Sequence, residues 1–179
     1  MKANTYEYPD FDKFNTFPKL LKHRSEIMPD EVALRNKDLG IWNEITWDEY
    51  NKIVSELSIG LKSIGFKKGD VLALIGDNKP EWVFFEIACH ANGGMSLGVY
   101  RDTLDDEVGY LVKSAKVKFA YAEDQEQVDK LINVQKKLKT KIKVIYDDPR
   151  GLEKLKNPNV INMKDLASVG KKQLNKNSK

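Results

Sequence analysis

The sequence predicts an α/β fold in which helices cover both faces of a parallel, doubly wound sheet. Short apolar runs alternate with segments of helical periodicity along most of the chain. The run at 71–75 is apolar at every position, as in a parallel strand that is buried on both sides. Its 179 residues suit one domain. We therefore expect one α/β subdomain over residues 1–170, followed by a basic, disordered tail over 171–179.

The first expected elements are a helix and a small β-hairpin. Leucine spacing after residue 17 marks a helix that ends before Pro29. Two stretches of β type, 32–35 and 41–45, flank a polar turn that ends at Gly40, and together they predict the hairpin.

A long amphipathic helix is expected to follow the hairpin. Thr46 and Glu49 have the spacing of a capping box, in which each side chain accepts a hydrogen bond from a free amide of the first turn. Apolar residues then recur at steps of three and four from Tyr50 to Ile64, and Gly65 ends the helix.

The remaining chain alternates between strands and helices. We expect strand 71–75, a helix from Pro80 to Ala91, strand 95–99, a helix capped by Thr103, strand 117–122, a helix begun by Asp124 and reaching Leu138, strand 142–146, a short strand at 160–162 and a short helix at 163–169.

Composition excludes several classes of protein. The net charge is only +3, from 30 basic and 27 acidic residues. Cys89 is the single cysteine, so neither an internal disulfide nor a zinc site is supported, and a cytoplasmic location is expected. The apolar window at 82–100 is interrupted by Glu86, His90 and a glycine pair, which argues against a transmembrane helix.

Ligands of parallel sheets bind beyond the carboxyl ends of the strands, so the loops there hold the candidate site residues. These loops are Gly76-Asp77-Asn78, Tyr100-Arg101-Asp102, Glu123-Asp124 and Asp147-Asp148-Pro149-Arg150. Their aspartates could converge on magnesium, but aspartate after a strand more commonly caps a helix or forms a turn, and we favour that interpretation.

No catalytic constellation is evident, and neither a dinucleotide-binding nor a phosphate-loop glycine pattern occurs. We expect His90 to be a structural histidine, Ser96 to lie inside an apolar strand, and Cys89 to be a small buried hydrophobe. The sequence therefore predicts no catalytic residue and no metal ligand.

The stretch ITWDEYNKIVSELSIGLKSIGFKKGDVLALIGDNKPEW, residues 45–82, resembles the opening region of AMP-forming acyl-CoA synthetases, which are adenylate-forming ligases. HANGGMSLGVYRDTL matches the next stretch of that family, and FAYAEDQEQVDKL and VIYDDPRGL resemble its branch that handles long-chain fatty acids. The match runs from about Phe17 to Leu166. Arg101 replaces the family's common proline, and Asn92-Gly93 replaces its alanine-glycine order.

The resemblance implies that the whole protein joins a fatty acid to coenzyme A, using ATP and Mg²⁺ and releasing AMP and pyrophosphate. The phosphate loop, the magnesium glutamate and the catalytic lysine of such enzymes lie downstream of the matched region. We therefore expect the isolated chain to be inactive and to bind none of these cofactors. The resemblance also gives Lys130 as a possible contact to the phosphate of coenzyme A, against the alternative of a solvent-facing lysine.

Two other interpretations stay open. The chain is alternatively a non-catalytic α/β module for binding or homodimerisation. Trp82, Phe84, Phe85 and the 100–112 helix could provide its surface, although burial against the sheet explains these residues as well. Nucleic-acid binding is the least favoured interpretation, and it would use the lysines of the tail: Lys171, Lys172, Lys176 and Lys179.

Overall fold

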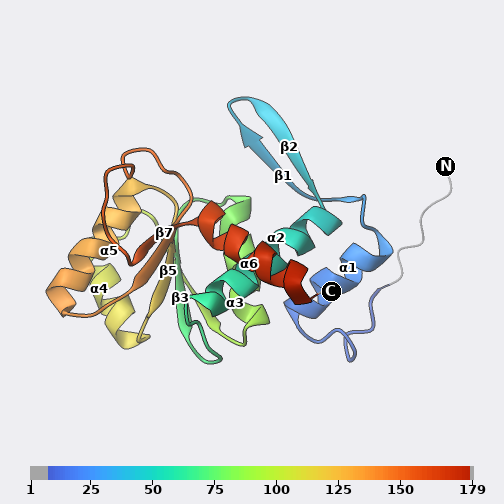
Figure 1. Ribbon diagram of the computed structural model, residues 1–179, viewed down its shortest axis with the longest axis horizontal. Helices are drawn as coiled ribbons and strands as arrows, with labels where there is room; N and C mark the ends of the chain where they lie inside the picture. The colour runs from blue at the N-terminus through green and yellow to red at the C-terminus, as the bar shows by residue number, and fades with distance from the viewer. Residues whose placement is uncertain (1–7, 178–179) are drawn as a thin grey trace.

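The computed structural model describes residues 8–177 and shows an α/β domain with helices on both faces of a parallel sheet (Figure 1). The helices are α1 (Phe17–Ile27), α2 (Trp47–Ser63), α3 (Pro80–Ala91), α4 (Asp105–Ser114), α5 (Gln125–Leu138) and α6 (Met163–Asn177). The strands are β1 (Val32–Asp38), β2 (Ile41–Thr46), β3 (Val71–Ile75), β4 (Met95–Val99), β5 (Phe119–Ala122), β6 (Lys143–Tyr146) and β7 (Val160–Asn162). The predicted fold class is confirmed.

The main sheet has the order β4-β3-β5-β6-β7, and all of its strand pairs are parallel. β3 and β5 lie in the interior, whereas β4 lies at one edge with only β3 beside it. Every residue of β3 and of β5 is buried, as the apolar runs predict.

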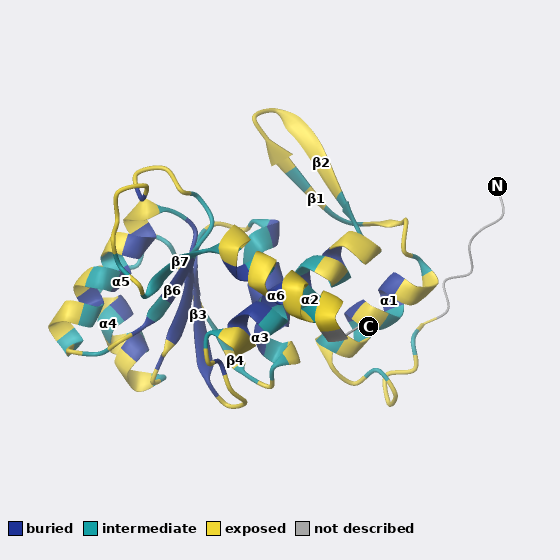
Figure 2. Cartoon of the chain, in the orientation of Figure 1, coloured by how far each residue is buried: buried dark blue, intermediate teal, exposed yellow. Residues whose placement is uncertain are grey.

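Side chains of β3 alternate between two cores, one on each face of the sheet. Leu72 and Leu74 pack into the core beneath α1, α2, α3 and α6. Val71, Ala73 and Ile75 pack into the core beneath α4 and α5. Figure 2 shows buried residues concentrated along the sheet and on the helix faces turned toward it.

The hairpin of β1 and β2 is antiparallel and projects from the body of the domain (Figure 1). Its turn places Leu39 and Gly40 at φ 46° and 83°, the backbone pattern of the tight turns that join hairpin strands. Arg35 and Glu44 face each other across the strands, with Nε 2.9 Å from Oε1. Both strands extend further than the sequence predicts.

Two predicted helix starts are confirmed. The Glu49 amide donates to Thr46 Oγ1 at 3.2 Å, and the Thr46 amide donates to Glu49 Oε2 at 2.9 Å. Asp124 caps α5 by accepting a hydrogen bond from the Gln127 amide at 3.1 Å. These local signals work because the partners lie within one turn of each other.

The predicted start of one helix and the predicted end of another are wrong. Thr103 does not cap α4, because its amide donates to the carbonyl of Tyr100 in a turn and Leu104 is the N-cap. The helix expected at 163–169 continues to Asn177, so residues 171–177 are helical where a disordered tail was expected. Gly170 is buried against α2, which holds the helix in place beyond its predicted end. Lys179 lies outside the described residues.

Candidate functional site

The loops at the carboxyl edge of the sheet meet, as the parallel strands predict. The Asp77 amide donates to Glu123 Oε2 at 2.6 Å, and the Asp148 amide donates to the Glu123 carbonyl at 2.9 Å. Arg101 reaches across the same edge, with Nη1 2.5 Å from Asp77 Oδ2 and Nη2 3.5 Å from Asp124 Oδ2. All four candidate loops are therefore tied together.

Glu123 is the centre of this arrangement. Its side chain is 7% exposed and forms an ion pair with Lys79, the N-cap residue of α3. Its amide donates to the carbonyl of Ile75 at 3.0 Å. A Cβ at Gly76 would lie 2.8 Å from Glu123 Cβ, so only glycine lets the loop after β3 pass this carboxylate.

Arg101, the departure from the family pattern, bridges two aspartates. The pKa of its guanidinium is raised, chiefly by the hydrogen bond to Asp77. Lys130 Nζ donates to the Arg101 carbonyl at 2.6 Å, so Lys130 holds the same loop from α5. Its proposed contact with coenzyme A stays a prediction.

Two acids in this region are less easily ionised than usual. Burial raises the pKa of both Glu81 and Asp147, and the nearby Glu123 carboxylate adds to the effect. Asp148 behaves in the opposite way, because its hydrogen bonds with Arg150 lower the pKa of that carboxyl to about 2. The loop after β6 therefore places Asp147, an acid with a raised pKa, directly before Asp148, an acid with a lowered pKa.

Replacing Asp147 with asparagine is expected to raise the free energy of unfolding, and to raise it more near neutral pH than near about pH 4. Because burial raises the pKa of Asp147, the wild type loses stability as pH rises through that raised value, and asparagine removes the loss. Urea unfolding across this pH range measures the effect. Asp148→Asn is the control, since its lowered pKa gives the opposite sign. Parallel pH profiles for Asp147→Asn and wild type would contradict the prediction.

The expected roles of the aspartates are partly confirmed. Asp124 caps a helix, and Asp148 Oδ1 accepts from the Arg150 amide at 3.0 Å in a turn. Within residues 8–177, no three of the histidine, cysteine and acidic side chains are grouped closely enough to hold a metal ion. The paired charges of this edge are thus suited to positioning loops.

A pocket of about 300 Å³ opens at the carboxyl ends of β3 and β4. It is lined by Gly76, Asn78, Trp82, Gly98, Val99 and Tyr100. Gly98 leaves space for the indole, since a Cβ there would lie 3.2 Å from Trp82. This pocket and the charged loops beside it form the candidate site, which can bind a ligand but carries no evident nucleophile.

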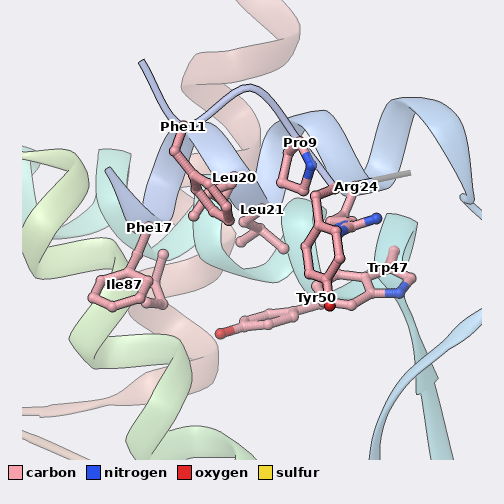
Figure 3. Close-up of a pocket in the computed structure, with 10 residues that line it drawn as sticks. Pro9, Phe11, Phe17, Leu20, Leu21, Arg24, Trp47, Tyr50 and Ile87 are labelled. Carbon is pink, nitrogen blue, oxygen red and sulfur yellow. The ribbon is translucent and has the colours of Figure 1, made fainter. Parts of the chain in front are cut away.

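A second, apolar pocket of about 390 Å³ lies elsewhere (Figure 3). Its lining comes from the segment before α1 and from α1, α2 and α3: Tyr8, Pro9, Phe11, Phe17, Leu20, Leu21, Arg24, Trp47, Tyr50 and Ile87. None of these residues belongs to the carboxyl-edge loops. Sequence reasoning missed this pocket because its aromatic residues come from segments far apart in the chain.

The remaining candidates have structural roles. Cys89 is fully buried, and burial raises the pKa of its thiol to about 12, which makes the thiol unreactive. His90 Nε2 lies 3.1 Å from Ser96 Oγ, which in turn donates to Glu86 at 3.2 Å. Glu86 was not foreseen as their partner. The serine therefore links the histidine to an acid and ties β4 to α3.

The residues considered for a docking surface are divided between the exterior and the core. In the 100–112 segment, Tyr100, Leu104 and Tyr110 are 88%, 70% and 71% exposed. Phe84 and Phe85 are 3% and 0% exposed and pack in the core, so the alternative of burial against the sheet is confirmed for them. Trp82 is partly buried against the same core. Lys171 shares a groove with Glu44, Glu49 and Glu56, whose charges offset that of the lysine.

Comparison with known proteins identifies the family of this chain. The model of the AMP-binding enzyme family matches residues 21–176. The chain belongs to this family. The resemblance found in the sequence is thereby confirmed, and the doubly wound sheet is the family's framework within this chain.

Individual relatives agree with that assignment. The long-chain-fatty-acid–CoA ligase ACSBG1 of Bos taurus is 25% identical over 142 residues, which are 79% of this chain and 19% of the relative. The luciferase-like enzyme of the mealworm Zophobas morio has a TM-score of 0.74 at 16% identity, covering 90% of this chain and 35% of that one. A putative long-chain-fatty-acid CoA ligase of Rhodopseudomonas palustris has a TM-score of 0.70 at 20% identity, covering 84% and 36%.

The chain thus spans about a fifth of the length of the curated relatives that it matches. Within residues 8–177, no helix has both the length and the apolar composition needed to cross a bilayer.

Proposed function

We propose that this chain is the N-terminal portion of an AMP-forming long-chain fatty acid–CoA ligase. The observation that carries the proposal is the family match over residues 21–176, together with similarity to long-chain-fatty-acid–CoA ligases over most of the chain. The whole protein would convert a fatty acid, ATP and coenzyme A to acyl-CoA, AMP and pyrophosphate, with Mg²⁺, in the cytoplasm.

In this proposal the chain supplies one wall of the adenylating site. The pocket at the ends of β3 and β4 is the part that faces the reaction, and Glu123, Lys79 and Arg101 hold its loops at fixed positions. Adenylation builds negative charge on phosphate, which needs donors aimed at the transferring group. Acidic side chains and paired cations predominate at the carboxyl edge, so those donors would come from the rest of the protein.

Pyrophosphate exchange with a fatty acid and ATP tests the proposal. We expect exchange by the protein encoded by the complete reading frame and none by residues 1–179 alone. Exchange by the isolated chain would overturn its assignment as an incomplete enzyme. A complete frame that folds but gives no exchange with any fatty acid would overturn the ligase assignment.

A further inference from the structure

Lysines gather at the amino edge of the sheet, opposite the candidate site. They lie in the connections that lead into β3, β5 and β6, and because these strands are parallel, the connections meet at one edge. The lysines are Lys67, Lys68, Lys116, Lys118, Lys139 and Lys141. Asp70 is the acid of these connections. The two edges of the sheet therefore carry opposite charge.

A groove of about 580 Å³ opens at this edge, between the last turns of α4 and α5. Its cations are Lys113, Lys116, Lys118 and Lys137. The apolar part of its lining is Val112, Val117 and Leu138, and Thr140 adds a hydroxyl. The groove thus combines ammonium groups with an apolar surface, which suits an anion attached to a less polar body.

Two of the four cations already have acidic partners. Lys118 Nζ lies 2.7 Å from Asp70 Oδ1, and Lys137 Nζ lies 3.0 Å from Asp106 Oδ1. Lys113 and Lys116 form no ion pair within the described part of the chain. These two ammonium groups leave an uncompensated positive charge on the groove.

The backbone is left-handed where each of the two helices ends. Lys116 and Lys139 have φ of 54° and 51°, the left-handed conformation that glycine adopts most easily after a helix. The helix dipole favours a cation in the last turn, and Lys113 and Lys137 already supply one for each helix. At Lys116 this conformation belongs to the C-cap of α4, in which the Val117 amide donates to the Val112 carbonyl at 3.0 Å. Glycine would adopt the same conformation at lower cost, which makes Lys116→Gly a substitution that removes the charge without disturbing the cap.

We propose that this groove binds phosphate groups of an anionic ligand, either a lipid head group or a soluble polyphosphate. Lys113 and Lys116 would contact the phosphate oxygens, and the apolar lining would contact the adjoining part of the ligand. A compact, concave site favours a single head group over duplex nucleic acid, whose phosphates extend along a long surface. The proposal is independent of the ligase assignment.

The test compares two probes on the full chain. Sodium tripolyphosphate is titrated calorimetrically, and vesicles of phosphatidylcholine with or without phosphatidic acid are used for co-sedimentation. For Lys113→Ala/Lys116→Gly we expect binding to weaken about 30-fold, from roughly fivefold per lysine. Lys171→Ala/Lys172→Ala removes the same charge from α6 and should bind like wild type.

Lys116→Gly alone separates binding from folding. Glycine relaxes the left-handed backbone, so its melting temperature should equal or exceed that of wild type while binding weakens. Binding to vesicles alone supports the lipid source, and binding to tripolyphosphate alone supports the soluble source. Binding to neither probe, equal loss in the α6 control, or equally tight binding of duplex DNA at the same salt concentration would overturn the proposal.

Discussion

Replacing Gly170 with alanine is expected to lower the free energy of unfolding by about 3 kcal/mol. α6 lies beside α2 (Figure 1), and a Cβ at Gly170 would lie 1.9 Å from the carbonyl oxygen of Glu56. The obstructing atom belongs to the backbone of α2, so the clash is relieved only if the helices separate. Gly60 makes the reciprocal approach, since its Cβ would lie 2.6 Å from the Leu166 carbonyl oxygen. Urea unfolding followed by circular dichroism measures the change.

Gly109→Ala is the matched control for this prediction. Gly109 also lies within a helix, but the nearest atom to its Cβ would be Val134 Cγ1 at 4.0 Å. Alanine should therefore stabilise α4 by about 0.7 kcal/mol through helix propensity alone. If both variants unfolded at the same urea concentration, the close approach of α2 and α6 would not determine the stability of the domain.

Replacing Glu123 with leucine is expected to cost about 3 kcal/mol of stability. The change removes the acceptor of the Asp77 amide and the counter-charge of Lys79, while the site stays buried. Because Lys79 is 40% exposed, water screens its unpaired charge, and we expect most of the loss to come from the unsatisfied amide.

Glu123→Gln distinguishes the two contributions. It keeps an oxygen acceptor for the Asp77 amide but removes the charge, so it should cost only about 1 kcal/mol. Urea unfolding gives both values, and hydrogen exchange of the Asp77 amide should speed up in the leucine variant alone. An equal loss in both variants would show that the ion pair, and not the hydrogen bond, dominates.

The fold was largely predictable because its signals are local. The capping box of Thr46 and Glu49 and the buried run of β3 need only neighbouring residues to be recognised. α6 was predicted too short because its lysine-rich end obscured the spacing of Leu166, Gly170 and Leu174, which places them on one face. Its continuation depends on packing against α2, a contact that no local pattern contains.

The candidate site was predictable in position but not in detail. Parallel topology placed the four loops at one edge, yet the pairing of Asp77 with Glu123 joins residues 46 positions apart. The burial of Gln127 was likewise not predictable from the sequence: this residue is 1% exposed, and its side-chain amide has no hydrogen-bond partner within residues 8–177. The apolar pocket beside α1 and the lysine-lined groove between α4 and α5 depend on how the helices pack together, and side-chain periodicity does not determine that packing.

The position of β4 at the border of the sheet has a practical consequence for handling this polypeptide. Its outward amides and carbonyls form a template on which another extended chain can add, and Met95–Val99 contains neither proline nor a charged residue to discourage it. When the polypeptide is expressed alone, concentration will favour aggregation along this border. A solubilising lysine at Met95, whose side chain is exposed, would be a simple safeguard.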